Sequence, residues 1–558
     1  MIGVIAHPEE HELVREFFEL FKTPWEFYRS EQQYEVALLA GEDVSGHGVS
    51  ADLIVVYSGR VNSFDEGEEI EVASSQKGRT LSYNDRRLPI YGDNITFRGK
   101  GVCILKDECS QQSVGSLAKS GSKAFARIGY DLFQEVRILL TVGQPSENAG
   151  IPTVEMHIAV LRDLIVRSGV PLVEIPPIPE GYAFIACLTH DVDHPSIRRH
   201  QWDHTMFGFL YRAVIGSVFG VLRGRIPVRH LCANWAAAVR LPFVYLGLAN
   251  DFWYGFDRYL AIEEDLDSTF FVLPFKNEPG RTASGRAPRI RASCYGASDI
   301  AERLQTFVSA GREVGLHGID AWIDVAKGQE EMAQITSITG AKNIGVRMHW
   351  LYFNENSPVA LEKAGFTYDS TVGYNETVGY RAGTAQVYKL LQAHQLLELP
   401  LHVMDTALFY PDYLNLTFEK ADRRVDEIVD HARQFGGAVT FNWHDRSIAP
   451  ERLWGEFYAS LMSGLKQKGA WCSSAGNVVS WFQVRRSIVF KQAGHEVAVT
   501  RRKEDMACGK SVPGLRLRVY NSGKSCESSS QRYVDSTLSG DMTVHLDRNS
   551  LVTQPLRS

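Results

Sequence analysis

From Tyr182 onward, the chain alternates apolar segments of strand length with segments whose apolar residues recur at the spacing of a helix. Residues 182–189 and 268–273 are almost wholly apolar, which is typical of strands covered on both faces. Helical stripes of apolar residues occupy 300–308 and 425–432, and each is closely followed by glycine, a common helix stop. Because strand–helix–strand units place their strands parallel, about three hundred residues of this alternation predict an α/β fold with a (β/α) barrel.

The alternation divides the 558 residues into four expected parts. Residues 1–120 predict an N-terminal α/β domain, because short apolar strands stand beside a helix with one apolar side. Residues 121–180 predict a helical connector, with 124–140 as one of its helices, and end in a proline-rich linker. Residues 181–486 contain the predicted barrel. In 487–558 short alternating segments replace the helical spacing, which predicts a small C-terminal β-sandwich-like module.

Composition places the chain among ordinary globular proteins and indicates its compartment. Apolar residues make up 44% and charged residues 22%, which excludes disordered and coiled-coil classes. The 59 Lys and Arg against 66 Asp and Glu give a net charge of −7, so no nucleic-acid partner is expected. The eight cysteines include no C-x-x-C pair, and the first residues show no basic region followed by an apolar run. We therefore expect a cytoplasmic protein.

The segment 206–222 is unusually apolar for a globular protein. It has 17 residues, contains Arg212 and is interrupted by three glycines, so it is shorter than the roughly 20 clean apolar residues of a membrane span. Arg223, Arg225 and Arg229 follow it. Two interpretations stay open: a helix that is buried or covers the active site, and an interfacial helix that makes a peripheral contact with the inner face of a membrane.

Titratable side chains gather at the ends of four predicted strands. Since barrel strands end at one common face, we expect these clusters to lie close together. A single histidine at such a place is often a satisfied core residue, but four clusters on successive strands are not explained in this way. Aspartate and histidine without cysteine suit a divalent, zinc-like ion with an open water position. The clusters occupy residues 188–194, 313–320, 345–350 and 440–446.

Asp191 and Asp193 stand in the first of these clusters. Two carboxylates two residues apart at a strand end can point to different sides, so that one binds a cation while the other accepts a proton. His190 and His194 flank them, which argues against a purely structural role.

With these clusters, the chain from about Tyr182 to Arg486 resembles the polysaccharide deacetylase family (carbohydrate esterase family 4, the NodB-homology domain), and especially its branch whose first motif reads THDVDH. The resemblance implies a distorted (β/α) barrel. It also implies a divalent metal, with Zn²⁺ the expected ion, that activates water to remove an N-acyl group from an amino sugar of a surface polysaccharide or its precursor. By the same resemblance, Asp191 is the base, and Asp193 and His317 bind the metal.

Other motifs of the family match in part. Arg347 corresponds to the arginine that orients the catalytic aspartate, and His444 to the histidine that protonates the leaving amine. A looser match makes Asp369 and Arg381 candidates for the rim of the substrate site.

One family position is different in this sequence. The family's second motif supplies another histidine four residues after the first, and Ala321 stands there instead. His349, His194 and Asp320 are available replacements. We favour His349, because it ends a neighbouring predicted strand two residues after Arg347.

Aromatic residues and the alternative functions complete the expectations. Trp322 and Trp350 are candidates to stack on sugar faces. The missing histidine leaves open a catalytically silent carbohydrate-binding or scaffold protein. A deformylase or deacetylase of a lipid-linked sugar is a further alternative, for which 206–222 would be the docking element.

Overall fold

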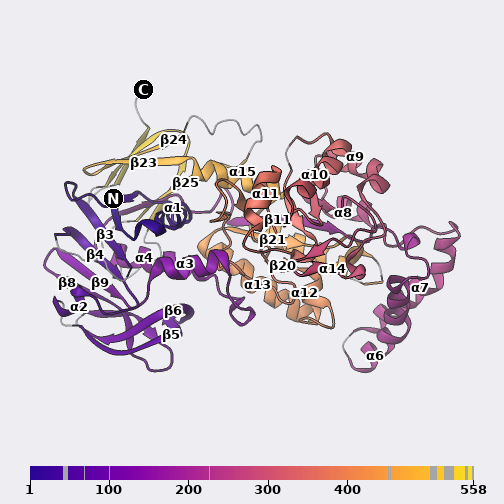
Figure 1. Cartoon of the computed structure of the whole chain (residues 1–558), viewed down its shortest axis with the longest axis horizontal. Coiled ribbons are helices and arrows are strands. Elements are labelled where there is room, and N and C mark those ends of the chain that lie inside the picture. Colours follow the sequence, from indigo (N-terminus) through magenta and orange to yellow (C-terminus); the bar gives the residue numbers. More distant parts are fainter. Residues whose placement is uncertain are drawn as a thin grey trace. The chain divides into compact units, whose positions relative to one another are not determined.

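The computed structural model divides the chain into two compact units, coloured along the sequence in Figure 1. Unit 1 contains Met1–Gly181, Ala382–Thr384 and Ser480–Ser558, and unit 2 contains Tyr182–Arg381 and Ala385–Val479. The structure describes residues 1–41, 48–67, 70–99, 101–224, 226–342, 344–449, 451–452, 454–502, 512–520, 533–546 and 551–555.

Unit 1 is built on a nine-stranded mixed sheet with the order β2-β1-β3-β4-β9-β8-β6-β5-β7. The first five strands in this order are parallel to one another, and the others pair antiparallel. The strands are β1 (Ile2–Ile5), β2 (Trp25–Phe27), β3 (Tyr34–Ala40), β4 (Ala51–Tyr57), β5 (Glu71–Tyr83), β6 (Arg86–Arg98), β7 (Val102–Asp107), β8 (Ser113–Ser120) and β9 (Lys123–Ile128). Its helices are α1 (His11–Leu20), α2 (Ser63–Gly67), α3 (Leu132–Thr141) and α4 (Thr153–Ser168).

The expected helix over 124–140 is partly wrong. Its first part is strand β9, which pairs with β4 on one side and β8 on the other. Only α3 is helical, and it begins where the Asp131 side chain accepts hydrogen bonds from the Phe133 and Gln134 amides.

The C-terminal strands of unit 1 belong to two different sheets. β23 (Ile488–Ala493), β24 (Glu496–Arg501), β27 (Met542–Leu546) and β28 (Leu551–Pro555) form an antiparallel sheet. β25 (Leu515–Tyr520) lies between β26 (Tyr533–Leu538) and β10 (Leu172–Glu174), a strand of the expected proline-rich linker. Residues 503–511, 521–532, 547–550 and 556–558 of the expected β-sandwich-like module lie outside the described residues. The described strands thus lie in two sheets, one of which includes β10, and a separate C-terminal all-β module is not confirmed.

Unit 2 contains a largely parallel sheet with the order β18-β19-β17-β16-β15-β12-β11-β21-β20, and β22 also pairs with β11. The path is open, since no pairing between its two end strands is recorded among the described residues. The α/β class is confirmed, but a closed barrel is not shown. The strands are β11 (Phe184–Val192), β12 (Thr269–Val272), β15 (Glu313–Gly318), β16 (Val346–Met348), β17 (Tyr368–Asp369), β18 (Tyr388–Lys389), β19 (Leu397–Glu398), β20 (Val403–Met404), β21 (Ala438–Asn442) and β22 (Ala470–Ser473), with a small hairpin of β13 (Arg281–Thr282) and β14 (Gly285–Arg286).

Helices connect these strands, and cap residues fix their ends. Thr417 accepts a hydrogen bond at the start of α13, which ends at Gly436. Pro358 lies in the first turn of α11, and Gly365 ends it in the left-handed conformation, as the sequence predicts. The helices are α8 (Phe256–Ile262), α9 (Ala301–Ser309), α10 (Val325–Thr339), α11 (Ser357–Ala364), α12 (Asp405–Phe409), α13 (Phe418–Phe435), α14 (Trp454–Gln467) and α15 (Ala475–Arg486), whose last residues belong to unit 1.

Between β11 and α8 the chain forms a helical arm, which we define as residues 204–245. It consists of α5 (His204–Leu210), the π-helical turn η4 (Tyr211–Gly216), α6 (Ser217–Leu222) and α7 (Val228–Tyr245). Figure 1 shows α6 and α7 at the edge of unit 2, away from β11 and β21. The continuous helix 204–222 is the one described helix that meets the length and composition of a membrane span, with a mean hydropathy of 1.6.

The close packing of β16 against β17 yields a first prediction. A side chain at Gly345 would overlap the buried ring of Tyr368, whose hydroxyl donates to Glu313. We expect Gly345→Ala to lower the free energy of unfolding by about 2 to 3 kcal/mol through overpacking, measured by urea denaturation. Gly464→Ala in α14 is the matched control, because nothing lies within 4 Å of an added methyl group there. Alanine favours a helix over glycine, so the free energy of unfolding should rise by up to about 1 kcal/mol. Equal losses in both variants would contradict this packing.

Candidate active site

The central strand β11 sends alternate side chains to opposite faces of the sheet. All nine of its residues are buried. Asp191 faces the site, whereas the ring nitrogens of His190 contact the Trp443 carbonyl and the Glu263 carboxylate on the other face, each at 2.9 Å. His190 is thus a core histidine with both ring nitrogens satisfied. His190 therefore supports the core side of the 188–194 cluster, and the two aspartates carry its polar contacts on the site side.

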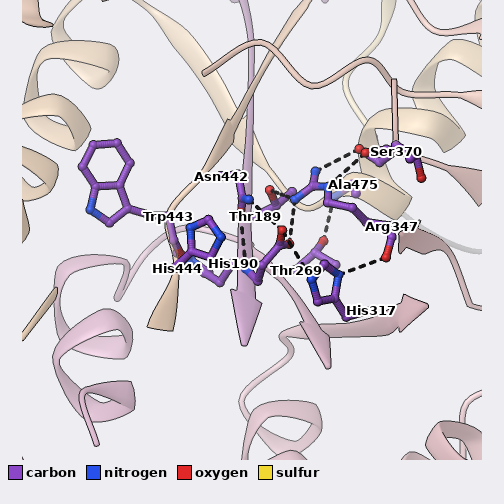
Figure 2. A network of polar contacts seen from close by, with 12 residues as sticks. Thr189, His190, Thr269, His317, Arg347, Ser370, Asn442, Trp443, His444 and Ala475 are labelled. Atoms are coloured by element: carbon purple, nitrogen blue, oxygen red, sulfur yellow. Dashed lines mark hydrogen bonds and ion pairs between the residues drawn. The ribbon is translucent and has the colours of Figure 1, made fainter. Parts of the chain in front are cut away.

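The Asp191 carboxylate accepts hydrogen bonds from Arg347 and Asn442, two residues of other strands that Figure 2 labels. Arg347 on β16 donates from Nη1 to Asp191 Oδ1 at 3.0 Å and to Thr189 Oγ1 at 2.7 Å. The other guanidinium nitrogens donate to the carbonyl and hydroxyl of Ser370, which fixes the orientation of Arg347. Asn442 on β21 donates from Nδ2 to Asp191 Oδ2 at 2.7 Å. Both carboxylate oxygens are therefore positioned.

These contacts also determine the charge of Asp191. Burial acts to raise the pKa of its carboxyl group, but the charges of Arg347, His317 and His444 outweigh burial and hold that pKa below the usual value. Asp191 is therefore ionised at neutral pH, although it is almost completely buried.

Three donor atoms from three chain segments meet beside Asp191. His317 Nε2, at the end of β15, lies 3.4 Å from Asp193 Oδ1, and His349 Nδ1, just after β16, lies 3.5 Å from the same oxygen. The two imidazole nitrogens are 3.0 Å apart. Asp193 Oδ1 is buried and has no hydrogen-bond partner among the described residues. The three atoms thus form a triangle around a common point.

The backbone fixes which nitrogen of each ring carries the proton. His317 Nδ1 lies 3.0 Å from the Arg347 carbonyl, and His349 Nε2 lies 3.0 Å from the Arg291 carbonyl. Because a carbonyl only accepts, the nitrogen that faces it must be the protonated one in a neutral ring. Burial lowers the pKa of His349 to about 3, so this ring is neutral at pH 7. His349 Nδ1 is therefore unprotonated, and His317 Nε2 is the lone-pair nitrogen of that ring in its neutral form; both nitrogens face the Asp193 carboxylate.

This donor set fits a divalent metal ion. Ligand atoms that lie 2.0 to 2.2 Å from a tetrahedral ion are about 3.3 to 3.6 Å from one another, close to the distances observed here. Two imidazole nitrogens and a carboxylate oxygen are zinc-type ligands, and they leave a fourth position open. Each imidazole also has the backbone partner that normally orients a metal-bound histidine. Asp193, His317 and His349 therefore form a candidate metal site.

The turn after β16 directs His349 into this site. Trp350 (φ 61°) and Leu351 (φ 53°) both adopt the left-handed conformation, which is rare for bulky residues and costs of the order of 1 kcal/mol or more each. This backbone begins immediately after His349, at the place where the chain must leave the sheet. The second imidazole of the candidate site is thus followed by two strained non-glycine residues rather than by a glycine turn.

His444 and Asp405 form a second charged pair at the site. His444 Nδ1 donates to Asp405 Oδ1 at 2.6 Å, and the His444 amide donates to Asp405 Oδ2 at 2.7 Å. Burial acts to lower the pKa of His444, but the Asp405 charge and hydrogen bond, with further contributions from Asp193 and Asp191, raise it to about 10. His444 Nε2 lies 3.8 Å from Asp193 Oδ2. A protonated imidazole thus faces the metal site.

The other two candidate ligands lie apart from the donor triangle. His194 lines the same cavity, but its Nδ1 contacts His200 Nε2 at 3.2 Å. Asp320 accepts a hydrogen bond from the Arg281 amide and lies near its guanidinium. The geometry thus brings His349, and neither of these residues, to Asp193 and His317.

A cavity of about 520 Å³ contains Asp191, Asp193, His317, His349 and His444 in its wall. This volume is in the range of small-ligand sites.

Among the four residues expected to bind substrate, only Trp350 lines this cavity, and its side chain is 38% exposed. Trp322 is buried and packs on Tyr352. Asp369 is fully buried at the Ser370 amide, and Arg381 donates to a backbone carbonyl outside the cavity wall. The substrate roles expected for Trp322, Asp369 and Arg381 therefore receive no support from their positions.

Sequence reasoning missed two residues of the site. Asn442 lies in the cluster 440–446, in which the sequence predicted a role for His444 alone. Asp405 follows an apolar stretch of 396–404, so its position at a strand end was the available signal. Neither residue could be assigned a partner without the sheet order, because both act through residues of distant strands.

The donor triangle predicts which substitutions remove the metal. We expect His349→Ala to lose zinc, as Asp193→Ala and His317→Ala should, because each removes one of three donors. His194→Ala and Asp320→Ala are the matched controls and should keep zinc. Metal content after dialysis against zinc-containing buffer, with the shift of the unfolding temperature on zinc addition, provides the measurement.

A second group of potential metal ligands must be prevented from binding zinc in this experiment. His200, Asp203 and Cys294 place ligand atoms within 4.8 Å of one another, so all variants are made in a Cys294→Ser background. Zinc retained in His349→Ala but lost in His194→Ala would contradict the assignment of His349.

Comparison with known proteins gives limited matches. No family model matches the sequence, and no curated protein matches it. Part of the chain is similar to solved structures, at low identity. A structure assigned as a polysaccharide deacetylase from Mycobacterium smegmatis shares 18% identity with a TM-score of 0.34, covering 56% of this chain and 96% of that one. An allantoinase shares 16% with a TM-score of 0.32, covering 55% and 91%. A mutant of a CE4 family pseudoenzyme shares 12% with a TM-score of 0.24, covering 40% and 61%. At TM-scores below 0.5, these similarities determine neither the activity nor the substrate of this chain.

Proposed function

We propose that this protein is a metal-dependent hydrolase that removes an N-acyl group, an N-acetyl group in the simplest case, from an amino sugar of a surface polysaccharide or its precursor. The observation that carries the proposal is the meeting of three potential ligand atoms beside an ionised buried aspartate and a protonated histidine. The residues have the identities expected from the motif resemblance, with His349 in place of the family's second histidine.

Asp193, His317 and His349 would hold the ion, and their chemistry favours Zn²⁺. A divalent ion in such a site lowers the pKa of a bound water toward about 7 and polarises an acyl oxygen. The chain supplies the remaining groups of the reaction.

Asp191 is positioned to accept a proton from the attacking water. Its two oxygens are held by Arg347 and Asn442, so the carboxylate cannot rotate away from the cavity. The Arg347 charge keeps it ionised, and a charge-assisted hydrogen bond keeps it oriented. Arg347 is thus a positioning residue for the base.

His444 is positioned to give a proton to the departing amine. An amide nitrogen cannot leave as an anion at neutral pH, so a proton donor is required. Asp405 holds His444 Nδ1, which leaves Nε2 directed toward the cavity side of Asp193. With a pKa of about 10, the imidazole carries this proton throughout the physiological range.

The first test of the proposal replaces the base. We expect Asp191→Asn to keep zinc but to lower the rate of acetate release from N-acetylglucosamine oligomers by about 10²- to 10⁴-fold, the usual contribution of a general base. Asp320→Asn is the control, since Asp320 is paired with Arg281 outside the donor triangle, and its rate should stay near wild type. A zinc-loaded wild-type protein that binds these oligomers without releasing acetate would instead indicate the catalytically silent alternative.

The second test addresses the proton donor through its pH dependence. Asp405 raises the pKa of His444, and the protonated form is the active one, so removing Asp405 should lower this pKa and move the alkaline limb of kcat/KM to lower pH. We expect Asp405→Asn to lose more activity at pH 8 than at pH 6, with unchanged zinc content. An alkaline limb at the wild-type position would contradict the role of the His444–Asp405 pair.

A further inference from the structure

The helical arm exposes an apolar surface that the fold itself does not cover. Along α5, η4 and α6, the exposed side chains Phe207, Tyr211, Ile215, Phe219 and Leu222 recur at helical spacing, so they form one stripe. Trp235, Val239 and Phe243 on α7, with Leu246 directly after the helix, form a second stripe. The exposed fractions of Leu222, Val239 and Leu246 are 75%, 70% and 71%.

A different set of apolar side chains packs the arm onto unit 2. Met206, Phe209 and Ala213 of the first helix meet Leu241 and Val244 of α7 in one buried cluster. The exposed stripes lie on the other faces of the same helices. Between 45% and 75% of the surface of each stripe residue stays exposed, and large exposed apolar patches of this kind mark interaction sites.

The charge of this region has one sign. Residues 204–250 contain five arginines and no Asp or Glu, whereas the chain average of 66 in 558 would place about five or six acidic residues there. Arg229 pairs with Glu456 of α14 at 2.9 Å, and Arg223 lies over the Phe219 ring. The arm thus combines apolar stripes with arginines, of which Arg229 is paired with an acidic residue outside the arm.

Two other occupants suit these features less well. A spanning helix requires lipid on all sides, but Met206, Phe209 and Ala213 are buried in protein and Arg212 interrupts the segment. A second copy of the chain would place the same acid-free, arginine-bearing surface against itself in a two-fold contact, which brings like charges together.

We propose that the helical arm docks on the surface of a lipid bilayer that contains anionic lipids. The stripes enter the boundary between headgroups and acyl chains, and Arg223 and Arg240 contact lipid phosphates. His204, Thr205 and Arg212 of the arm also line the cavity of the candidate active site, so the docked surface borders that cavity. Docking requires no turnover, so it can be tested separately from the proposed hydrolase.

Vesicle flotation of the full chain tests the docking. We expect the protein to float with vesicles of phosphatidylcholine containing about one-third phosphatidylglycerol, to bind phosphatidylcholine vesicles more weakly, and to dissociate at high salt. Arg223→Gln and Arg240→Gln should each weaken binding by about fivefold.

The apolar stripes are tested by a matched pair of triple variants. Leu222→Glu, Val239→Glu and Leu246→Glu together should weaken binding by more than about tenfold. Val61→Glu, Val142→Glu and Val308→Glu change the net charge equally at exposed valines outside the arm, so they should leave binding near wild type. Unchanged circular dichroism confirms that both proteins fold.

Three outcomes would overturn the proposal. The first is a wild-type protein that does not float with anionic vesicles at low salt. The second is an equal loss of binding in the two triple variants. The third is self-association that depends on protein concentration and disappears in the arm variant while vesicles are not bound, which would make a second copy the occupant.

Discussion

Burying two carboxylates at the end of one strand requires that positive charge and hydrogen-bond donors reach them from elsewhere. Asp191 lies at the end of β11 and Asp193 directly after the strand, and their side chains are only 4% and 15% exposed. Arg347 and Asn442 satisfy the first carboxylate from β16 and β21. The second is left to two imidazoles and to the ion that these three groups fit. The order of the strands in unit 2 therefore determines which side chains reach the two carboxylates.

The sequence predicted those parts of the site that depend on local chemistry. The sequence places Asp191, Asp193, His317 and Arg347 at or near strand ends, where parallel strands share one face, and the motif resemblance suggested their roles. Helix ends followed from caps in the same way, as at Gly365 of α11. These signals lie within a few residues of one another, so they can be read without knowing the fold.

Non-local pairing accounts for what the sequence did not predict. Residues 123–128 carry an apolar pattern that fits more than one structure, and they become β9 because β4 and β8 offer free edges. β10 and β25, more than three hundred residues apart, share a sheet for the same reason. Asp405 gains its role only because β20 pairs with β21, which ends two residues before His444. These strand pairings depend on the whole fold and cannot be inferred from neighbouring residues in the sequence.

The side chains of β11 alternate between two faces of the sheet, and substitutions on the two faces should have different effects. On one face of this strand Asp191 serves the proposed chemistry, and on the other His190 and Glu263 form a buried pair that belongs to the core. A substitution in the core face would change the amount of folded protein, whereas one in the site face would change the turnover of each folded molecule. Mutations of two neighbouring residues, His190 and Asp191, can therefore affect protein abundance and specific activity independently. An assay that measures only total activity in cells would not distinguish the two effects.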